Sequence, residues 1–222
     1  MIIYEGPSML DGQPIVAILT GDKGRGTANR KTGKMGQLWI LRAGVSPVEA
    51  VKTGADASVC GDCPLRGTKC YVNVGQAPGA VWRAWVAGSY PQDDGADFER
   101  PLRMGAYGEP AALPLSVLQN LANRAPGHTG YTHQWRDRPE LSGLLMASCE
   151  TAEDEAQATA AGWRFFSTGP GAGAIQCPAD SRGIKCADCK LCNGAGAAKS
   201  IWIDPHGAGA AAMLASGARA GA

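Results

Sequence analysis

The chain has 222 residues, enough to bury a core without the help of disulfides or metals, and its formal net charge is +1. A balance of 21 Lys and Arg against 20 Asp and Glu gives no electrostatic footprint for nucleic acid or an anionic membrane, so we expect neither as a partner. The opening residues, MIIYEGPSML, lack the features of a signal peptide, and no apolar run approaches a membrane span. We therefore expect a soluble protein of the cytoplasm.

The N-terminal third predicts two strands joined by a long polar loop. The strands are residues 14–20 and 37–43, which are short apolar runs rich in Ile, Val and Leu. The loop between them, GDKGRGTANRKTGKMG, matches no phosphate-loop spacing, so we favour a solvated loop over a phosphate contact. Ser46 as a cap and Gly54 as a stop then delimit a short helix.

Strand and helix patterns alternate along the rest of the chain. The expected strands are residues 102–108, 129–133, 144–150, 163–169 and 200–204, and the expected helices are 78–88, 113–123, 138–144 and 151–162. This alternation implies parallel pairing with right-handed crossovers. We therefore expect an α/β fold, a TIM-like or partial (β/α) barrel with parallel strands and a C-terminal cysteine-rich segment.

The domain organisation follows from the same pattern. We expect one domain, residues 1–222, whose parts are a barrel-like core at 15–168 with a cluster loop at 60–71, a cysteine-rich metal-binding segment at 177–192 and a Gly/Ala-rich tail at 207–222. The tail is expected to fray or to form a loosely docked helix.

Polar residues end four of the expected strands. They are Tyr107-Gly108-Glu109, His133-Gln134, Cys149-Glu150 and Ser167-Thr168. Chemistry in barrels of this kind gathers at the carboxyl ends of the strands, so we expect the active site at this edge. His128 and His133 are five residues apart and point to opposite faces of an ideal strand. His133 is the candidate for substrate contact or proton transfer, and a purely structural histidine is the alternative.

The first cysteine group has the pattern C-x2-C-P-x5-C-Y and contains Cys60, Cys63 and Cys70. Clustered cysteines in a chain without a secretion signal indicate metal rather than disulfides. Three thiolates leave one iron of a [4Fe–4S] cluster open for a ligand, whereas a structural zinc site uses four protein ligands. We favour the iron–sulfur cluster. The alternative is a closed, inert site whose fourth ligand is Cys149 or a downstream cysteine.

The second group, C-P-x7-C-x2-C-x2-C, holds four thiols. These are Cys177, Cys186, Cys189 and Cys192. They form a complete metal-binding set, and either an iron–sulfur cluster or zinc fits the spacing. A single cluster that shares ligands from both groups is a third arrangement compatible with the sequence.

Several segments together resemble an uncharacterised family of cysteine-rich proteins encoded by tailed bacteriophages. The segments are NRKTGKMG, SVCGDCPLRGTKCY, MGAYGEPAALP, TGYTHQW, LMASCE with AGWRFF, and QCP with CADCKLC. The resemblance spans residues 29–192. It implies a phage accessory protein in the cytoplasm of a bacterial host, and it brings no established reaction with it.

The chain is also similar, more weakly, to the radical S-adenosylmethionine enzymes. The similarity lies in the order of a strand, a three-cysteine loop ending in Cys70-Tyr71, a helix, a second strand and Gly108-Glu109-Pro110. It implies that Cys60, Cys63 and Cys70 hold the cluster, and that Gly108 and Glu109 lie near the amino group of the bound methionine moiety. The family spacing C-x3-C-x2-C differs from C-x2-C-x6-C here.

The leading hypothesis is an iron–sulfur enzyme that binds S-adenosylmethionine (SAM) and promotes cleavage of a C–S bond by a radical or lyase-type route. Glu109, Tyr107 and His133 would orient the ligand, a small-molecule substrate would be the main partner, and a host reductant would be another. The alternatives are a zinc-stabilised phage accessory protein that binds a host protein or nucleic acid without catalysis, and a simple electron carrier.

Overall fold

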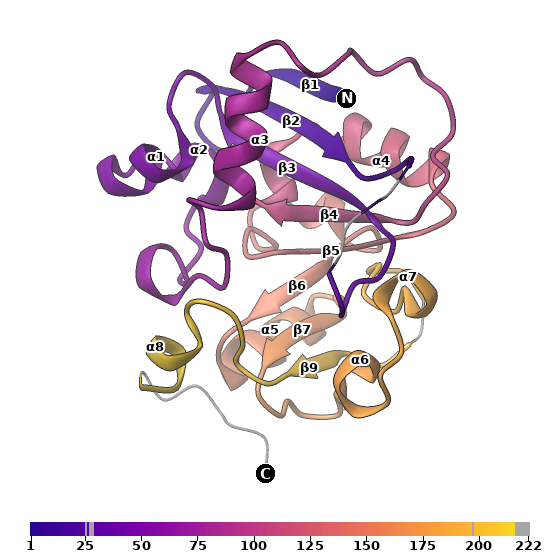
Figure 1. The fold of residues 1–222 in the computed structure, drawn as a ribbon. Helices are drawn as coiled ribbons and strands as arrows, with labels where there is room; N and C mark the ends of the chain where they lie inside the picture. Colours follow the sequence, from indigo (N-terminus) through magenta and orange to yellow (C-terminus); the bar gives the residue numbers. More distant parts are fainter. Residues whose placement is uncertain (25, 27–28, 197, 216–222) are drawn as a thin grey trace.

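The computed structural model describes residues 1–24, 26, 29–196 and 198–215 (Figure 1). Its strands are β1 (Ile2–Pro7), β2 (Pro14–Thr20), β3 (Gly36–Arg42), β4 (Leu102–Tyr107), β5 (His128–Thr132), β6 (Met146–Cys149), β7 (Phe165–Thr168), β8 (Ile175–Gln176) and β9 (Ile201–Ile203). Its α-helices are α1 (Pro47–Thr53), α2 (Ala57–Cys60), α3 (Ala77–Val86), α4 (Leu115–Arg124), α5 (Ala152–Ala160), α6 (Pro178–Ser181), α7 (Cys186–Cys189) and α8 (Ala210–Ala215), with 3₁₀ turns η1 (Gly67–Lys69), η2 (Pro110–Ala112) and η3 (Pro139–Leu141). None of these helices is long and apolar enough to cross a membrane.

The described strands form one sheet in the order β1-β2-β3-β4-β5-β6-β7-β9-β8. The pairs β1–β2 and β2–β3 are antiparallel, and every later pair is parallel. The expected α/β class is confirmed. The sheet is not closed into a TIM barrel, because β1 forms one of its edges and β8 the other. The parallel series begins at β3 and extends to β9.

Local signals account for the boundaries of the regular helices. The Ser46 side chain accepts a hydrogen bond from the Glu49 amide at the start of α1, and Gly54 ends that helix at a φ of 79°. Thr151 and Asp154 form a reciprocal capping box at the start of α5. The helix expected at 138–144 is only the short turn η3. Strand β1 and the four-residue helices α2, α6 and α7 are absent from the sequence-based expectations.

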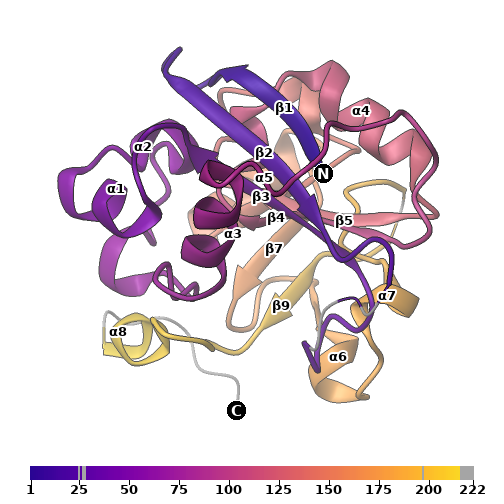
Figure 2. The same ribbon diagram turned by 45° about the horizontal axis from the view of Figure 1, so that its top comes forward.

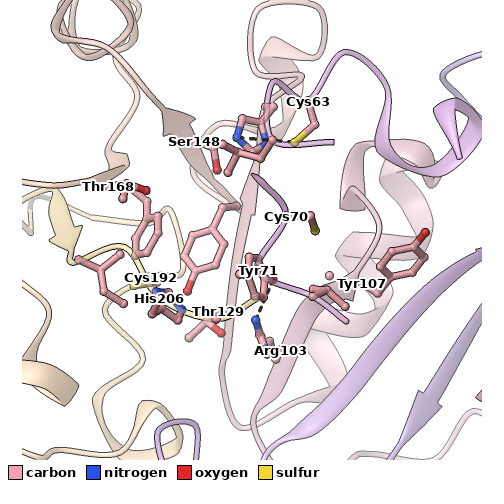
Figure 3. Close-up of a pocket in the computed structure, with 18 of the residues that line it drawn as sticks. Cys63, Cys70, Tyr71, Arg103, Tyr107, Thr129, Ser148, Thr168, Cys192 and His206 are labelled. Carbon is pink, nitrogen blue, oxygen red and sulfur yellow. Dashed lines mark hydrogen bonds between the residues drawn. The ribbon is translucent and has the colours of Figure 1, made fainter. Parts of the chain in front are cut away.

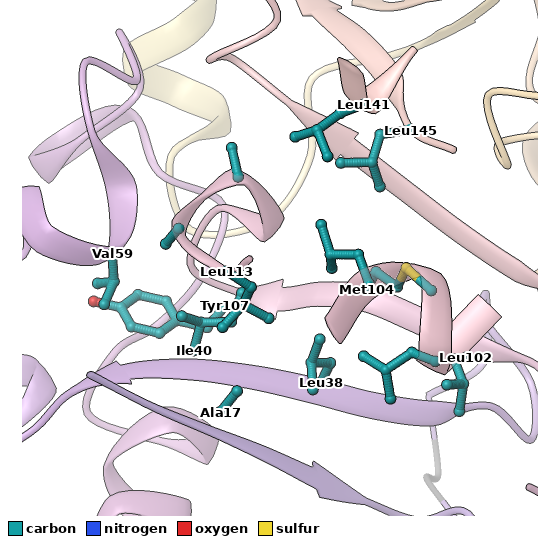
Figure 4. Close-up of a cluster of buried hydrophobic side chains, with 14 of the residues drawn as sticks. Ala17, Leu38, Ile40, Val59, Leu102, Met104, Tyr107, Leu113, Leu141 and Leu145 are labelled. Carbon is teal, nitrogen blue, oxygen red and sulfur yellow. The ribbon is translucent and has the colours of Figure 1, made fainter. Parts of the chain in front are cut away.

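The two faces of β4 show why its sequence alternates. Leu102 and Met104 are fully buried in the main hydrophobic core together with Leu118 of α4 (Figure 4). Burial of each such side chain stabilises the fold by about 1.5–3 kcal/mol. Arg103 and Gly105 alternate with them and line a cavity on the other face of the sheet. Tyr107 also borders the cavity, but its ring packs in the main core (Figure 4). At β4 the sheet therefore has one face in the core and one face toward the cavity, whereas β2 is buried on both faces.

The C-terminal cysteine segment packs against the polar loop that follows β2. The Cys186 amide donates to Lys31 O over 3.2 Å, and the Ala187 amide donates to Thr32 O over 3.0 Å. Lys31 also pairs with Asp180 at 2.8 Å. The expectation of a solvated loop is thus wrong for residues 31 and 32, because their carbonyl groups accept hydrogen bonds from the start of α7. Figures 1 and 2 show α6 and α7 beside β9.

The tail forms helix α8 next to the first cysteine loop (Figure 1). A Cβ added to Gly209 would overlap Lys69 O, and one added to Gly207 would lie 2.7 Å from Tyr71 O. Only glycine permits this close backbone approach. The described part of the tail is thus a docked helix, and residues 216–222 of the expected tail lie outside the described residues.

Candidate metal centre

A cavity of about 420 Å³ lies on the face of the sheet opposite the main core (Figure 3). It is lined by alternate residues of successive strands and by the residues that directly follow them, including Tyr107, Tyr131, His133, Ser148, Glu150, Phe166 and Thr168. Cysteines of both groups also line it: Cys60, Cys63, Cys70, Cys177, Cys186 and Cys192. The volume is within the range of small-molecule and cofactor sites. Figure 3 shows Cys63 and Cys192 at different sides of the cavity.

The loop of the first cysteine group is held by a buried ion pair. Cys60 is the last residue of α2, Cys63 lies in the following turn, and Cys70 follows η1. Arg66 binds both carboxylate oxygens of Asp56, with distances of 2.6 and 3.1 Å. The same guanidinium donates to Gly61 O over 3.1 Å, so it joins the start of α2 to the turn between the cysteines. These contacts hold the loop between Asp56 and Arg66 in place.

The thiols of the first group are electrostatically coupled. Burial raises the pKa of Cys60 well above its ordinary value, and the charges of Glu109 and Cys63 raise it further. Burial also raises the pKa of Cys70, with a further contribution from the Cys63 charge. Thiols with a raised pKa keep their protons, and a bound cation would stabilise their thiolate forms. Metal binding here would therefore release protons.

His133 is the centre of a hydrogen-bonded group next to Cys63. Its Nδ1 lies 2.8 Å from Glu109 Oε1, and its Nε2 lies 3.2 Å from Glu150 Oε1 and 4.0 Å from Cys63 Sγ. Burial alone lowers the pKa of His133, but the hydrogen bonds to Cys63, Glu109 and Glu150 outweigh it and hold the pKa well above its usual value. One potential ligand atom from each of Cys63, Glu109 and His133 lies within 4.8 Å of the others. This spacing suits a metal ion.

Tyr107 and Gly108 complete this end of the cavity. The Tyr107 hydroxyl is buried without a hydrogen-bond partner among the described residues, and burial strongly raises its pKa. Gly108 has a φ of +82°, and a Cβ there would lie 2.6 Å from Ile40 O. The Glu109 amide donates to Val59 O over 2.6 Å, which joins the end of β4 to α2. The predicted site residues Tyr107, Gly108, Glu109 and His133 thus all line the same cavity as the first cysteine group.

The second cysteine group lies at the other end of the cavity. Cys177, Cys186 and Cys192 line it, whereas Cys189 lines a small adjoining pocket together with these three. Burial raises the pKa of Cys192 and of Cys186, and the charges of Cys177 and Cys189 raise both further. The four thiols are therefore neighbours, as the spacing predicts.

Cys149 does not belong to either group. It is fully buried in the main core, its thiol points to Ala147 O at 3.7 Å, and it does not line the cavity. The expectation that it supplies a fourth ligand is wrong, because Cys149 faces the helix-covered side of β6 while Ser148 and Glu150 face the cavity. The His133 ring, in contrast, lies in the cavity and contacts Cys63 Sγ at 4.0 Å.

Sequence reasoning missed several cavity residues. Arg103, Tyr131 and Phe166 lie within strands rather than at their carboxyl ends, and Tyr71 and His206 lie in flanking segments. Arg103 and Tyr131 could have been predicted from the period-2 pattern of β4 and β5, because each lies between two buried residues of its strand. All eight cysteines are free thiols in this structure.

Comparisons with protein-family models, with curated proteins and with solved structures give no significant match.

Proposed function

We propose that the protein holds a [4Fe–4S] cluster on Cys60, Cys63 and Cys70 and binds SAM at the open iron, promoting cleavage of a C–S bond. The observation that carries the proposal is that all three cysteines of the first group line a cofactor-sized cavity together with Glu109 and His133. A three-thiolate cluster with an open iron needs such an adjoining space.

The chemistry of the donor set fits the cluster. The three thiols come from one loop, their pKa values are coupled through charge, and the loop is braced by the Arg66–Asp56 pair. When bound, the cluster would supply an iron that coordinates the amino and carboxylate groups of SAM and, after reduction by a host reductant, one electron. The two carboxylates of the described cavity lining, Glu109 and Glu150, both contact His133. The thiols of the first cysteine loop are therefore the groups at this end that would bind the cluster.

The residues of the chain would bind and orient the ligand. Glu109 offers a carboxylate oxygen to a ligand amino group, and its contacts to the amide and ring of His133 fix its position. The Tyr107 ring borders the cavity, whereas its hydroxyl lies beside Val59 in the core (Figure 4), so Tyr107 would contribute an apolar contact. Holding the ligand in one orientation is the main contribution that such a protein makes.

The topology supports the same proposal. Strands β3, β4, β5, β6, β7 and β9 are parallel neighbours in chain order, as in a partial (β/α) barrel, and the first cysteine group follows the first of them. The polar groups at the carboxyl ends of β4, β5, β6 and β7 then face one cavity.

Anaerobic assays with SAM test the proposal. The reduced, iron-loaded protein should consume SAM and release a sulfur-containing fragment, either methionine or methylthioadenosine. Cys60→Ala should abolish the reaction, whereas Cys149→Ala, the same substitution at a core cysteine outside the cavity, should retain it. Absence of any change in the visible spectrum on addition of SAM to iron-loaded protein would contradict the proposal.

A zinc-stabilised accessory protein without catalysis is the second candidate. The observation that favours it is the Cys63, Glu109 and His133 group, because one thiolate, one carboxylate and one imidazole within 4.8 Å are ordinary zinc ligands. It predicts colourless protein with stoichiometric zinc, no labile sulfide and no response to SAM. In that case the C-terminal cysteine group would hold a second zinc as a structural knot.

A further inference from the structure

Arg103 is a half-buried cation without a carboxylate partner among the described residues. It lies near the start of β4, and its guanidinium faces the cavity. Its one hydrogen bond within the described chain runs from Nη2 to Tyr71 Oη over 2.9 Å (Figure 3). A guanidinium has five N–H donors, so most of its donor capacity is not used by the residues that the structure describes.

Several other arginines of the described chain have more partners than Arg103. Arg66, Arg124, Arg136 and Arg138 each pair with a carboxylate. Three more have no carboxylate partner, but each donates to at least two oxygens of the chain: Arg42, Arg100 and Arg164. Arg103 makes no ion pair within the described residues. Burying a charge without an opposite charge is costly, so a site that retains one is built for an anion.

The carboxylates of the cavity do not compensate Arg103. The described lining contains two of them, Glu109 and Glu150, and both contact His133. Figure 3 shows Arg103 at the opposite side of the cavity from Cys63, which lies 4.0 Å from the His133 ring. Lys31, the other Lys or Arg of the described lining, is paired with Asp180. The cavity therefore has an acidic end at His133 and a cationic end at Arg103.

The surroundings of Arg103 suit the organic part of a ligand. Tyr71, which accepts its hydrogen bond, is stacked on His206 with ring centroids 5.8 Å apart. Tyr131 and Phe166 form a second ring pair in the cavity wall, with centroids 4.3 Å apart. Flat apolar surfaces beside a guanidinium are a common way to bind an organic acid.

We infer that Arg103 and Tyr71 form a subsite for the acidic group, a carboxylate or a phosphate, of a second small-molecule substrate. The inference rests on the proposed function for the identity of the first ligand, SAM. Binding of the anion itself does not require the cluster. The Arg103 guanidinium has two alternative roles in the same position. It could bind the carboxylate of SAM, or it could stabilise negative charge on the nearby Cys186.

Calorimetric titration of the full chain, purified without air, with benzoate and with phenyl phosphate tests the inference, and benzamide is the uncharged control. At least one of the two anions should bind the parent at least roughly tenfold more tightly than benzamide. Arg103→Gln should lose at least roughly tenfold in affinity for the anion and leave benzamide unchanged. The anion affinity of Arg103→Lys should lie between those of the parent and Arg103→Gln. Arg83→Gln, which changes an exposed arginine on α3, should bind the anion as tightly as the parent.

Three results would overturn the inference. The first is equal anion affinity in the parent and Arg103→Gln, or no anion binding to the parent. The second is displacement of the anion by SAM, which would assign the guanidinium to the carboxylate of SAM. The third is loss of metal from the C-terminal cysteine group in Arg103→Gln with unchanged anion affinity. Iron content and the spectral response to SAM are measured on the same samples, so failure of the proposed function is seen separately.

Discussion

At position 108 the backbone has a φ of +82°, and a Cβ would lie 2.6 Å from Ile40 O. Gly143 has nearly the same φ, +83°, but a Cβ added there would meet no atom within 4 Å. Gly143→Ala should therefore cost about 1 kcal/mol from backbone strain alone. Gly108→Ala should cost roughly 2–4 kcal/mol, because a backbone clash adds to the strain. Urea unfolding measures the free energy of unfolding of both variants. Equal destabilisation would show that the backbone around Ile40 can move to accept a Cβ at position 108.

Glu109 is the residue whose charge should matter most for the ligand. Glu109→Gln keeps an oxygen that accepts from the His133 amide but removes the negative charge. We expect SAM to bind roughly tenfold more weakly, because a charge-assisted hydrogen bond becomes a neutral one, while the iron content is unchanged. A spectral titration with SAM measures the affinity, with the exposed Glu49→Gln as the control. Loss of iron in Glu109→Gln would instead make Glu109 a metal ligand.

At the scale of elements, the first cysteine loop depends on the pair between Arg66 and Asp56. Asp56 is 3% exposed, so Arg66→Met would leave a buried carboxylate without its partner. We expect a loss of about 3 kcal/mol in the free energy of unfolding and faster release of metal from the loop. Thermal unfolding and the rate of iron loss to a chelator measure the two effects. Arg83→Met is the matched control, and an unchanged chelation rate in Arg66→Met would mean that the loop is held in another way.

The segment between α3 and β4 is joined to the end of α4 by a second ion pair. Arg124 binds both carboxylate oxygens of Asp93 at 2.6 and 2.7 Å. The hydrogen bonds from Arg124 hold the pKa of Asp93 below its ordinary value. A lowered pKa in the folded state stabilises the fold above the unfolded pKa of about 3.9, and the contribution is lost as the pH falls through the folded value.

The pH dependence of Asp93→Asn tests this link. The stability difference between the parent and Asp93→Asn should be full at about pH 6. It should shrink as the pH falls below the unfolded pKa of about 3.9 and through the lower folded pKa, because the parent carboxylate then becomes neutral as well. Urea unfolding at a series of pH values measures it. A difference that stays constant down to low pH would show that the Asp93 charge does not stabilise the fold.

At the scale of the molecule, the sequence is a good guide wherever short-range signals decide the structure. Ser46 and Gly54 mark the ends of α1, and the capping residues mark the start of α5, since caps act within one helical turn. The alternation of strands and helices predicts the parallel series because chain order and sheet order coincide from β3 to β7.

Long-range pairing explains what the sequence does not predict. The antiparallel β1 and β2 at one edge keep the sheet open, and no local pattern distinguishes an edge strand from a barrel strand. That the two cysteine groups share a cavity depends on the C-terminal segment packing on Lys31 and Thr32. Cys149 ends a strand and is for that reason a candidate ligand in the sequence, but the pleat of β6 turns it into the core.

The most direct test of a cluster on Cys60, Cys63 and Cys70 is the iron and acid-labile sulfide content of protein purified without air. Because the C-terminal group can carry its own metal, the measurement compares the parent with Cys60→Ala and with the core variant Cys149→Ala. We predict that Cys60→Ala loses about four iron and four sulfide per chain, the content of one [4Fe–4S] cluster, while Cys149→Ala keeps the content of the parent. Equal iron and sulfide in Cys60→Ala and the parent, or zinc in place of iron in both, would contradict the account.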